Sequence, residues 1–333
     1  MAAVLQSRVP AADAGLRLVD WLARRFAYLD AVGWHGAVAA GAVARNGRRA
    51  AADETLAAGD LVAYSPAPAR PRDVPVLYAD EDVVVVDKPA GLVVQHTSTS
   101  PARTFLARLA ETFPPGGGAA RLAAIHRLDR DTSGVLMVAR TPTALRTWSE
   151  RFAERRIIKE YLAVVRGSPH RDAFSLDRPI GPATASLVRS RQAVLPTGTP
   201  GAKPARTDVE VAARWSGHAL LRLRPHTGRT HQLRAHLADA GWPIVHDPLY
   251  GQSDASYLAW VADRKASDPT GEVLAPTRQL LHALRLTATG AAPGDCHCWQ
   301  APVAADFLAA ITASGGPHVA DEALRWRGDG HAP

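Results

Sequence analysis

Residues 126–139 read HRLDRDTSGVLMVA, a polar loop that runs directly into an apolar segment. The apolar part, residues 135–139, has the pattern of a buried strand. One short acidic side chain, Asp129, lies among His126, Arg127 and Arg130 just before that strand. Because loops held by rigid strands commonly carry functional groups, this stretch predicts a central strand and a candidate site together.

Further apolar segments predict strands at residues 83–86, 160–165, 209–214 and 220–223. Helices are predicted over 143–154 and 229–240, the second ended by Gly241. The strands outnumber the helices and mostly lack the regular crossover spacing of a doubly wound sheet. We therefore expect an α+β fold around a mixed, largely antiparallel sheet.

A small α/β unit is predicted at the N-terminus, over residues 1–64. Apolar residues at helical spacing indicate helices around 18–26 and 38–43, Asn46-Gly47 indicates a tight turn, and residues 61–64 indicate a strand. Four prolines within residues 65–75 predict a semi-rigid linker. We expect the large domain over 76–315 and a flexible tail over 316–333.

The chain carries a net charge of +7, and its basic residues are 35 arginines and 4 lysines. Guanidinium groups stay charged, fork onto phosphate and stack on bases, so this excess fits a polyanionic partner such as RNA. The alternative is that the excess of arginine is only an incidental consequence of coding bias. Cys296 and Cys298 are too close in sequence for a good disulfide, and no segment is typical of a signal peptide or membrane span. We expect a cytoplasmic protein that does not bind membranes.

Asp129 could simply form a turn, as most loop aspartates do. An EF-hand loop is a second alternative, because Asp129, Asp131 and Ser133 fit its first ligand positions. The twelfth position would then be Arg140, a cation where calcium requires a glutamate, which excludes that site. The order His-Arg-Leu-Asp also differs from the kinase order, and no glycine-rich phosphate loop precedes it.

The chain has four histidines within residues 226–246, which raises the question of a metal site. His231 and His236 are five residues apart, about 140° around a helix, so they do not share one face. We therefore expect no metal. A metal-dependent phosphoesterase remains a rival function, and activity that survives EDTA would exclude it.

Six segments together resemble the RluA-type pseudouridine synthases, which isomerise uridine in RNA. The first is HRLDRDTSG at 126–134. The others are DKPAGLVV (87–94), KEYLAVV (159–165), HTGRTHQLRAHL (226–237), GWPI with DPLYG (241–251) and RQLLHA (278–283). His96 is displaced by one residue from the family pattern, and His246 stands where glycine is common. The resemblance implies a fold of the pseudouridine-synthase type.

Such an isomerase breaks a glycosidic bond without water, turns the freed base and rejoins it through carbon. One carboxylate can attack or stabilise the sugar, a guanidinium keeps that carboxylate ionised, and aromatic and arginine side chains hold a flipped base. By resemblance, Asp129 is the catalytic carboxylate, Tyr161 stacks on the target uracil and Arg234 pairs with Asp129. No metal or organic cofactor is implied. Substrate-binding roles are expected for Arg127, Arg229, His231 and Leu233.

The N-terminal unit resembles the ribosomal-protein S-four-like RNA-binding module through GAVARNG at 41–47 and AGDLV at 58–62. RNA-facing charge is expected from Arg24, Arg25, Arg45, Arg48, Arg49 and Lys159. The expected substrate is large-subunit ribosomal RNA, with transfer RNA as the alternative. A non-catalytic RNA-binding protein on the same fold is the competing function. We expect a monomer.

Overall fold

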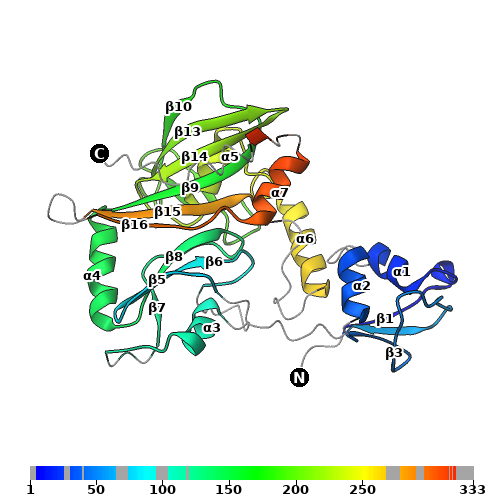
Figure 1. Cartoon of the computed structure of the whole chain (residues 1–333). Helices are drawn as coiled ribbons and strands as arrows, with labels where there is room; N and C mark the ends of the chain where they lie inside the picture. The colour runs from blue at the N-terminus through cyan, green and yellow to red at the C-terminus, as the bar shows by residue number, and fades with distance from the viewer. Residues whose placement is uncertain are drawn as a thin grey trace. The chain divides into compact units, whose positions relative to one another are not determined.

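The computed structural model falls into two compact units, residues 1–73 with 268–276 and residues 74–267 with 277–333 (Figure 1). The residues that the structure describes are 5–25, 31–39, 41–64, 74–94, 104–117, 119, 121–267, 278–289, 296–314, 316 and 318–319. The predicted linker, apart from its last two residues, and nearly all of the predicted tail lie outside these ranges.

The first unit packs two helices on a four-stranded antiparallel sheet of order β1-β4-β2-β3. Its core centres on Leu18, Trp21 and Trp34, each fully buried. The elements are β1 (Leu5–Arg8), the short 3-10 helix η1 (Ala11–Asp13), α1 (Leu18–Arg25), α2 (Ala31–Ala39), β2 (Val43–Arg45), β3 (Arg48–Arg49) and β4 (Leu61–Tyr64).

The second helix of this unit lies earlier than predicted. It ends at Ala39, and Val43 begins strand β2. Short apolar runs fit either a helix or a strand, and Val43 is buried by pairing with Tyr64 of β4. The Asn46-Gly47 turn is confirmed: both residues have positive φ, as a tight hairpin between β2 and β3 requires.

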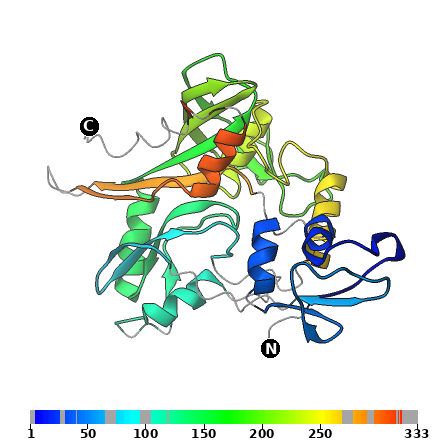
Figure 2. The same cartoon turned by 45° about the vertical axis from the view of Figure 1, so that its right-hand side comes forward.

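The second unit is built on a ten-stranded sheet. Eight strands follow the order β10-β13-β14-β9-β15-β8-β6-β5, while β16 pairs with β15 and β7 pairs with β8 (Figures 1 and 2). A separate pair joins β11 and β12. The strands are β5 (Val76–Ala79), β6 (Val83–Lys88), β7 (Ala123–Ala124), β8 (Ser133–Ala139), β9 (Ile157–Arg166), β10 (Ala173–Asp177), β11 (Ile180–Pro182), β12 (Gln192–Val194), β13 (Arg206–Trp215), β14 (His218–Pro225), β15 (Leu281–Thr289) and β16 (Cys296–Gln300).

Five helices accompany this sheet. Thr104 caps α3 and Thr141 caps α4, each by accepting a hydrogen bond from a backbone N–H three residues on. In α4, Trp148 makes an edge contact with Trp299 of β16, so this helix lies beside the β15–β16 hairpin in both views (Figures 1 and 2). The helices are α3 (Phe105–Thr112), α4 (Pro142–Ala153), α5 (Gln232–Asp239), α6 (Asp254–Ser267) and α7 (Ala305–Ala313).

Strand β15 divides the sheet at its middle. One side of β15 pairs antiparallel with β9 along its length. The other side pairs in parallel with β8 at His282 and Ala283, and then antiparallel with β16 from Arg285 onward. The sheet is thus mixed and mostly antiparallel, which confirms the predicted fold class. The predicted strands 83–86, 135–139, 160–165, 209–214 and 220–223 all lie within observed strands.

Several observed elements were not predicted, among them α3, α6, α7 and β16. Helix α6 has only a weak pattern of polar and apolar residues, which gives little sign of a helix. Strand β16 is largely exposed, and both cysteines are among its exposed residues, so it lacks the apolar run of a buried strand. The helix predicted over 229–240 begins later, at Gln232. His231 is its N-cap residue and has a left-handed backbone conformation, so the residues before it are not helical. The helix predicted over 143–154 is α4, shifted by one residue.

Gly134 allows β8 and β15 to approach each other. Its φ is +110°, and a Cβ atom there would lie 2.0 Å from the carbonyl oxygen of Ala283. Because that oxygen belongs to the backbone of a buried strand, it cannot move aside as a side chain could. Gly134 is also the residue through which the loop containing Asp129 enters the sheet.

We predict that Gly134→Ala lowers the free energy of unfolding by about 3 kcal/mol or more, through a backbone clash added to backbone strain. Gly217→Ala is the matched control, because Gly217 also has a positive φ but has no atom within 4 Å of the added Cβ. It should cost only the strain, about 1 kcal/mol. Urea denaturation of both variants checks this, and equal costs would contradict the close-approach explanation.

Candidate active site

A cavity of about 340 Å³ lies in the second unit where the loop before β8, strand β9 and the start of α5 meet. Residues far apart in sequence line it, including Asp129, Tyr161 and Arg234. Lys159 lines it too. So do all four predicted substrate-binding residues, Arg127, Arg229, His231 and Leu233. The structure therefore brings these eight predicted residues together.

Lys88 anchors the loop that carries Asp129 through a hydrogen bond to its backbone. The Lys88 side chain is fully buried, and its Nζ donates hydrogen bonds to the carbonyl oxygens of Pro89, Leu92 and Arg130. The N–H of Gly91 donates to the same Arg130 carbonyl. Burial lowers the pKa of Lys88 to about 7, against the raising effect of nearby acidic groups. The 88–92 turn thus holds the backbone next to Asp129 in place.

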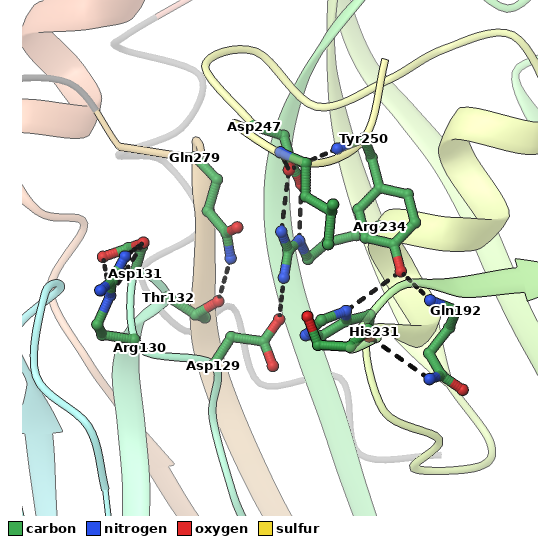
Figure 3. Close-up of polar contacts among 12 residues, drawn as sticks. Asp129, Arg130, Asp131, Thr132, Gln192, His231, Arg234, Asp247, Tyr250 and Gln279 are labelled. Carbon is green, nitrogen blue, oxygen red and sulfur yellow. Dashed lines mark hydrogen bonds and ion pairs between the residues drawn. The ribbon is translucent and has the colours of Figure 1, made fainter. Parts of the chain in front are cut away.

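Arg234 lies on α5 and contacts Asp129 directly (Figure 3). Its Nη1 donates to Oδ2 of Asp129 at 2.9 Å. The same guanidinium forks onto Asp247, with Nε to Oδ2 at 2.7 Å and Nη2 to Oδ1 at 2.9 Å. Only 8% of the Arg234 side chain is exposed, so this cation lies in a poorly solvated place between two carboxylates.

Asp129 is held in its ionised form. Burial is the largest single influence and would raise the pKa of this carboxyl, but Arg234 and other cations outweigh it and hold the pKa below its usual value. His231 is among the neighbours, yet burial lowers its own pKa to about 4. At neutral pH, His231 is therefore uncharged, and the stabilising charge comes from Arg234 with a smaller part from Arg127.

Tyr161 reaches the cavity because side chains alternate along β9. Lys159 and Tyr161 face the cavity, while Glu160 between them faces away and pairs with Arg222, Arg224 and Arg285. Tyr161 is only 9% exposed. Burial, and then the charge of Asp129, raise the pKa of its phenol well above the usual value, so the phenol stays protonated.

The rim of the cavity is basic and its floor apolar. Arg127 is exposed, and Arg229 is anchored by its Nε, which donates to the carbonyl oxygen of Pro204. Nζ of Lys159 donates to the Thr227 carbonyl oxygen, and burial lowers the Lys159 pKa to about 8. Leu233 is 7% exposed and lines the cavity wall.

The other five predicted RNA-binding residues belong to the first unit, not to this cavity. Arg24 and Arg25 end α1, and Arg48 and Arg49 form β3, all four with exposed side chains. Arg45 differs, because its guanidinium pairs with Glu54 and Asp60 and only 25% of its side chain is exposed. Its charge is thus balanced within the unit, and the RNA-facing role expected of it stays a prediction.

Three residues at the site were missed in the sequence. Asp247 and Tyr250 lie in the recognised segment DPLYG, and Lys88 lies in DKPAGLVV, but no role was predicted for them. An aspartate followed by proline suggests a turn, so the spacing alone gave no reason to place Asp247 beside Arg234. His126 lines the cavity as well, where its Nε2 accepts a hydrogen bond from the Met137 N–H.

Three histidines within residues 226–246 each form a hydrogen bond with a different residue. His226 contacts Asp208, His231 contacts Tyr250 and His236 contacts Thr207. Among the residues that the structure describes, no three His, Cys, Asp or Glu side chains are grouped as a metal site would need. Nor does any helix in those ranges have the length and apolar character needed to cross a membrane.

Comparison with known proteins agrees with this geometry. Residues 82–239 match the family described as RNA pseudouridylate synthase. A protein named ribosomal large subunit pseudouridine synthase D, from Xanthomonas campestris pv. campestris, is 34% identical over 316 residues, and the match covers 92% of each chain. The chain belongs to the RNA pseudouridylate synthase family.

Other relatives in this family support the assignment. Proteins with the same name are 35% identical in Nitrosomonas europaea and in Escherichia coli K12, with matches that cover 72% of this chain. The match spans 64% of the Nitrosomonas protein and 71% of the Escherichia protein. The RluA-type resemblance and the enzyme class predicted from the sequence are thereby confirmed.

Solved structures of pseudouridylate synthases share the fold. The human RNA pseudouridylate synthase domain containing 4 has a TM-score of 0.54 and 25% identity, over 72% of this chain and 93% of that one. The human RNA pseudouridylate synthase domain containing 1 has a TM-score of 0.51 and 27% identity, over 71% of this chain and 86% of that one. The pseudouridine-synthase type of sheet predicted from the sequence is confirmed.

We predict that Arg234→Met in this synthase fold lowers the free energy of unfolding by about 3 kcal/mol at neutral pH, because buried carboxylates lose their counter-charge. Burial would then raise the pKa of Asp129 above its unfolded value, so folding takes up a proton. The variant should therefore gain stability as the pH falls from about 8 to 5. In the wild type the pKa of Asp129 is lowered, so its contribution is constant there and is lost only at lower pH. Urea denaturation across this range tests both curves; parallel curves would contradict the prediction.

Proposed function

We propose that this chain converts uridine to pseudouridine in large-subunit ribosomal RNA, with Asp129 as the catalytic carboxylate. The observation that carries the proposal is the Asp129–Arg234 ion pair, which lies in one cavity with Tyr161. A carboxylate kept ionised in a mostly buried place is a good nucleophile and a strong stabiliser of positive charge on a sugar. The cavity volume of about 340 Å³ suits a single flipped nucleotide.

The reaction is an isomerisation in which one carbon–nitrogen bond breaks and one carbon–carbon bond forms. The target uridine leaves its stack and enters the cavity. Asp129 then attacks the sugar or the base, or assists a glycal-type path. The freed uracil turns against Tyr161, C5 bonds to the sugar and loses its proton, and N1, which no longer holds the sugar, takes up a proton. Because Tyr161 stays neutral, its ring is suited to stacking on the uracil and its phenol to donating a hydrogen bond.

The remaining cavity residues fit binding roles. Arg127 and Arg229 stand at the rim, where a guanidinium can hold phosphate or fill the space left by the flipped base. Leu233 offers an apolar contact to the base. His231, neutral at pH 7, can donate or accept a hydrogen bond without changing the charge at Asp129.

Ribosomal RNA is the favoured substrate because the relatives that match are named ribosomal large subunit pseudouridine synthase D. Transfer RNA is the alternative. Mapping pseudouridine in all stable RNAs of a deletion strain tests this choice. Loss of modification in the large-subunit RNA alone supports the proposal, and loss in transfer RNA alone overturns it.

We predict that Asp129→Asn abolishes pseudouridine formation while leaving RNA affinity within about threefold, because the amide keeps the shape but not the charge. Asp131→Asn is the matched control on the same loop; Asp131 pairs with Arg130 and does not line the cavity. It should keep turnover within about threefold. A tritium-release assay and filter binding provide the two measurements. Substantial turnover by Asp129→Asn would remove Asp129 from the mechanism, and wild-type protein that only binds RNA would favour the non-catalytic alternative.

We also propose that the first unit binds RNA through the exposed arginines of α1 and β3. Changing Arg24, Arg25 and Arg48 together to Gln should make the plot of log Kd against log salt less steep by up to about 2, or about 0.7 for each lost phosphate contact. Arg45→Gln should leave the slope unchanged, since Glu54 and Asp60 already balance that charge. Filter binding over a range of salt measures the slopes. An unchanged slope in the triple variant would exclude this unit from RNA binding.

A further inference from the structure

Arg234 donates hydrogen bonds from three different nitrogen atoms to two carboxylates. Nε and Nη2 donate to Asp247 as a fork, and Nη1 donates to Asp129 (Figure 3). A fork fixes the plane and the direction of a guanidinium, because two parallel hydrogen bonds permit only one orientation. The nitrogen left for Asp129 therefore points in a direction that Asp247 determines.

Asp247 is itself held rigidly. Its side chain is completely buried, and its Oδ1 also accepts hydrogen bonds from the N–H groups of Leu249 and Tyr250 at 2.9 Å each. The Tyr250 ring lies against the other side of the cation, with the Arg234 Cζ atom 5.0 Å from the ring centroid. This distance is within the range of a cation–π contact. Backbone, carboxylate and ring thus fix the guanidinium from outside the cavity.

The charges at the site also depend on Asp247. With Asp129, Arg234 and Asp247 all ionised, the three side chains carry a net charge of −1. Without the negative charge of Asp247, the full positive charge of Arg234 would act on Asp129 and bind its oxygen more tightly. A carboxylate bound in that way is a poorer nucleophile, because attack on carbon must first weaken the ion pair.

We propose that Asp247, together with the ring of Tyr250, is a positioning residue that aims Arg234 at Asp129 and limits how strongly the arginine binds that carboxylate. This rests on the roles proposed above for Asp129 and Arg234. Asp247 does not line the cavity, and among the described residues Arg234 is the one cavity-lining side chain to which it is hydrogen-bonded. Changes at Asp247 should therefore alter turnover more than RNA binding.

The same chain holds a similar fork whose carboxylate, Asp306, is 59% exposed and does not line the cavity. Arg278 forks onto Asp306, with Nε to Oδ2 at 2.6 Å and Nη2 to Oδ1 at 3.0 Å. Oδ1 of Asp306 also accepts the N–H of Phe307, whose ring centroid lies 6.0 Å from the Arg278 guanidinium. Here Nη1 donates to backbone carbonyl oxygens and not to a cavity carboxylate. Asp306→Asn thus removes a similar fork without touching Asp129.

The test is a double-mutant cycle between Asp247→Asn and Arg234→Lys in the full chain, assayed by single-turnover pseudouridine formation. Asp247→Asn alone should lower the rate about 30-fold or more while RNA affinity changes less than about threefold. Once Arg234 is lysine the fork no longer exists, so Asp247→Asn should then cost less than about threefold, or even restore some rate. Asp306→Asn should leave the rate within about threefold.

A merely structural role predicts a different pattern. In that case Asp247→Asn would lower the fraction of protein able to bind RNA, and its cost would be the same in both backgrounds. Either result would overturn the proposal. If Asp247→Asn does not fold, Tyr250→Leu replaces it in the cycle and is compared with Tyr250→Phe. Both variants lose the hydroxyl that contacts His231 and the Gln192 N–H, but only Tyr250→Phe keeps the ring against Arg234. Tyr250→Leu should be about tenfold slower than Tyr250→Phe, and this difference should disappear when Arg234 is lysine. Retained turnover by Asp129→Asn would instead show that the proposed function has failed, whatever the result at Asp247.

Discussion

The ion pair between Asp129 and Arg234 is the contact on which the candidate site depends. It joins residues 105 positions apart in sequence, one on a loop and one on a helix, so its 2.9 Å distance requires both backbones to be fixed. Lys88 fixes the loop by donating a hydrogen bond to the Arg130 carbonyl oxygen. The close approach of Gly134 to Ala283 fixes the point where the loop enters the sheet.

A buried ion pair is a costly way to hold a protein together, because two charges lose their hydration. Here the cost is offset by additional hydrogen bonds, since Asp247 accepts two backbone N–H groups as well as the arginine fork. The remaining donor of Arg234 extends to Asp129, whose side chain is 20% exposed, and so places a charged oxygen at the cavity. Charge fixed in a poorly solvated site is suited to stabilising charge that develops on a sugar or a base.

The sequence predicted the parts of this arrangement that depend on local pattern. Apolar runs located the central strands, and the alternation along β9 places Lys159 and Tyr161 on one face by itself. The resemblance to a known family supplied the pairing of Arg234 with Asp129, which no spacing rule gives. Asp247 was missed because its contact with Arg234 depends on how the chain after α5 turns back. The second helix of the first unit was misplaced because Val43 becomes a strand residue only through pairing with β4.

Two arginines of the second unit use the same kind of fork in different places. Arg278 comes just before β15 and uses its fork to hold α7, while its remaining nitrogen binds backbone oxygens. Arg234 uses the same fork on Asp247 but leaves its remaining nitrogen facing the cavity. The two arginines thus share the fork but differ in the burial of the carboxylate, with Asp247 fully buried and Asp306 59% exposed, and in where the last donor points. That direction is set by the backbone to which each carboxylate is bound, and so the fold, more than the residue type, brings one of them to the cavity.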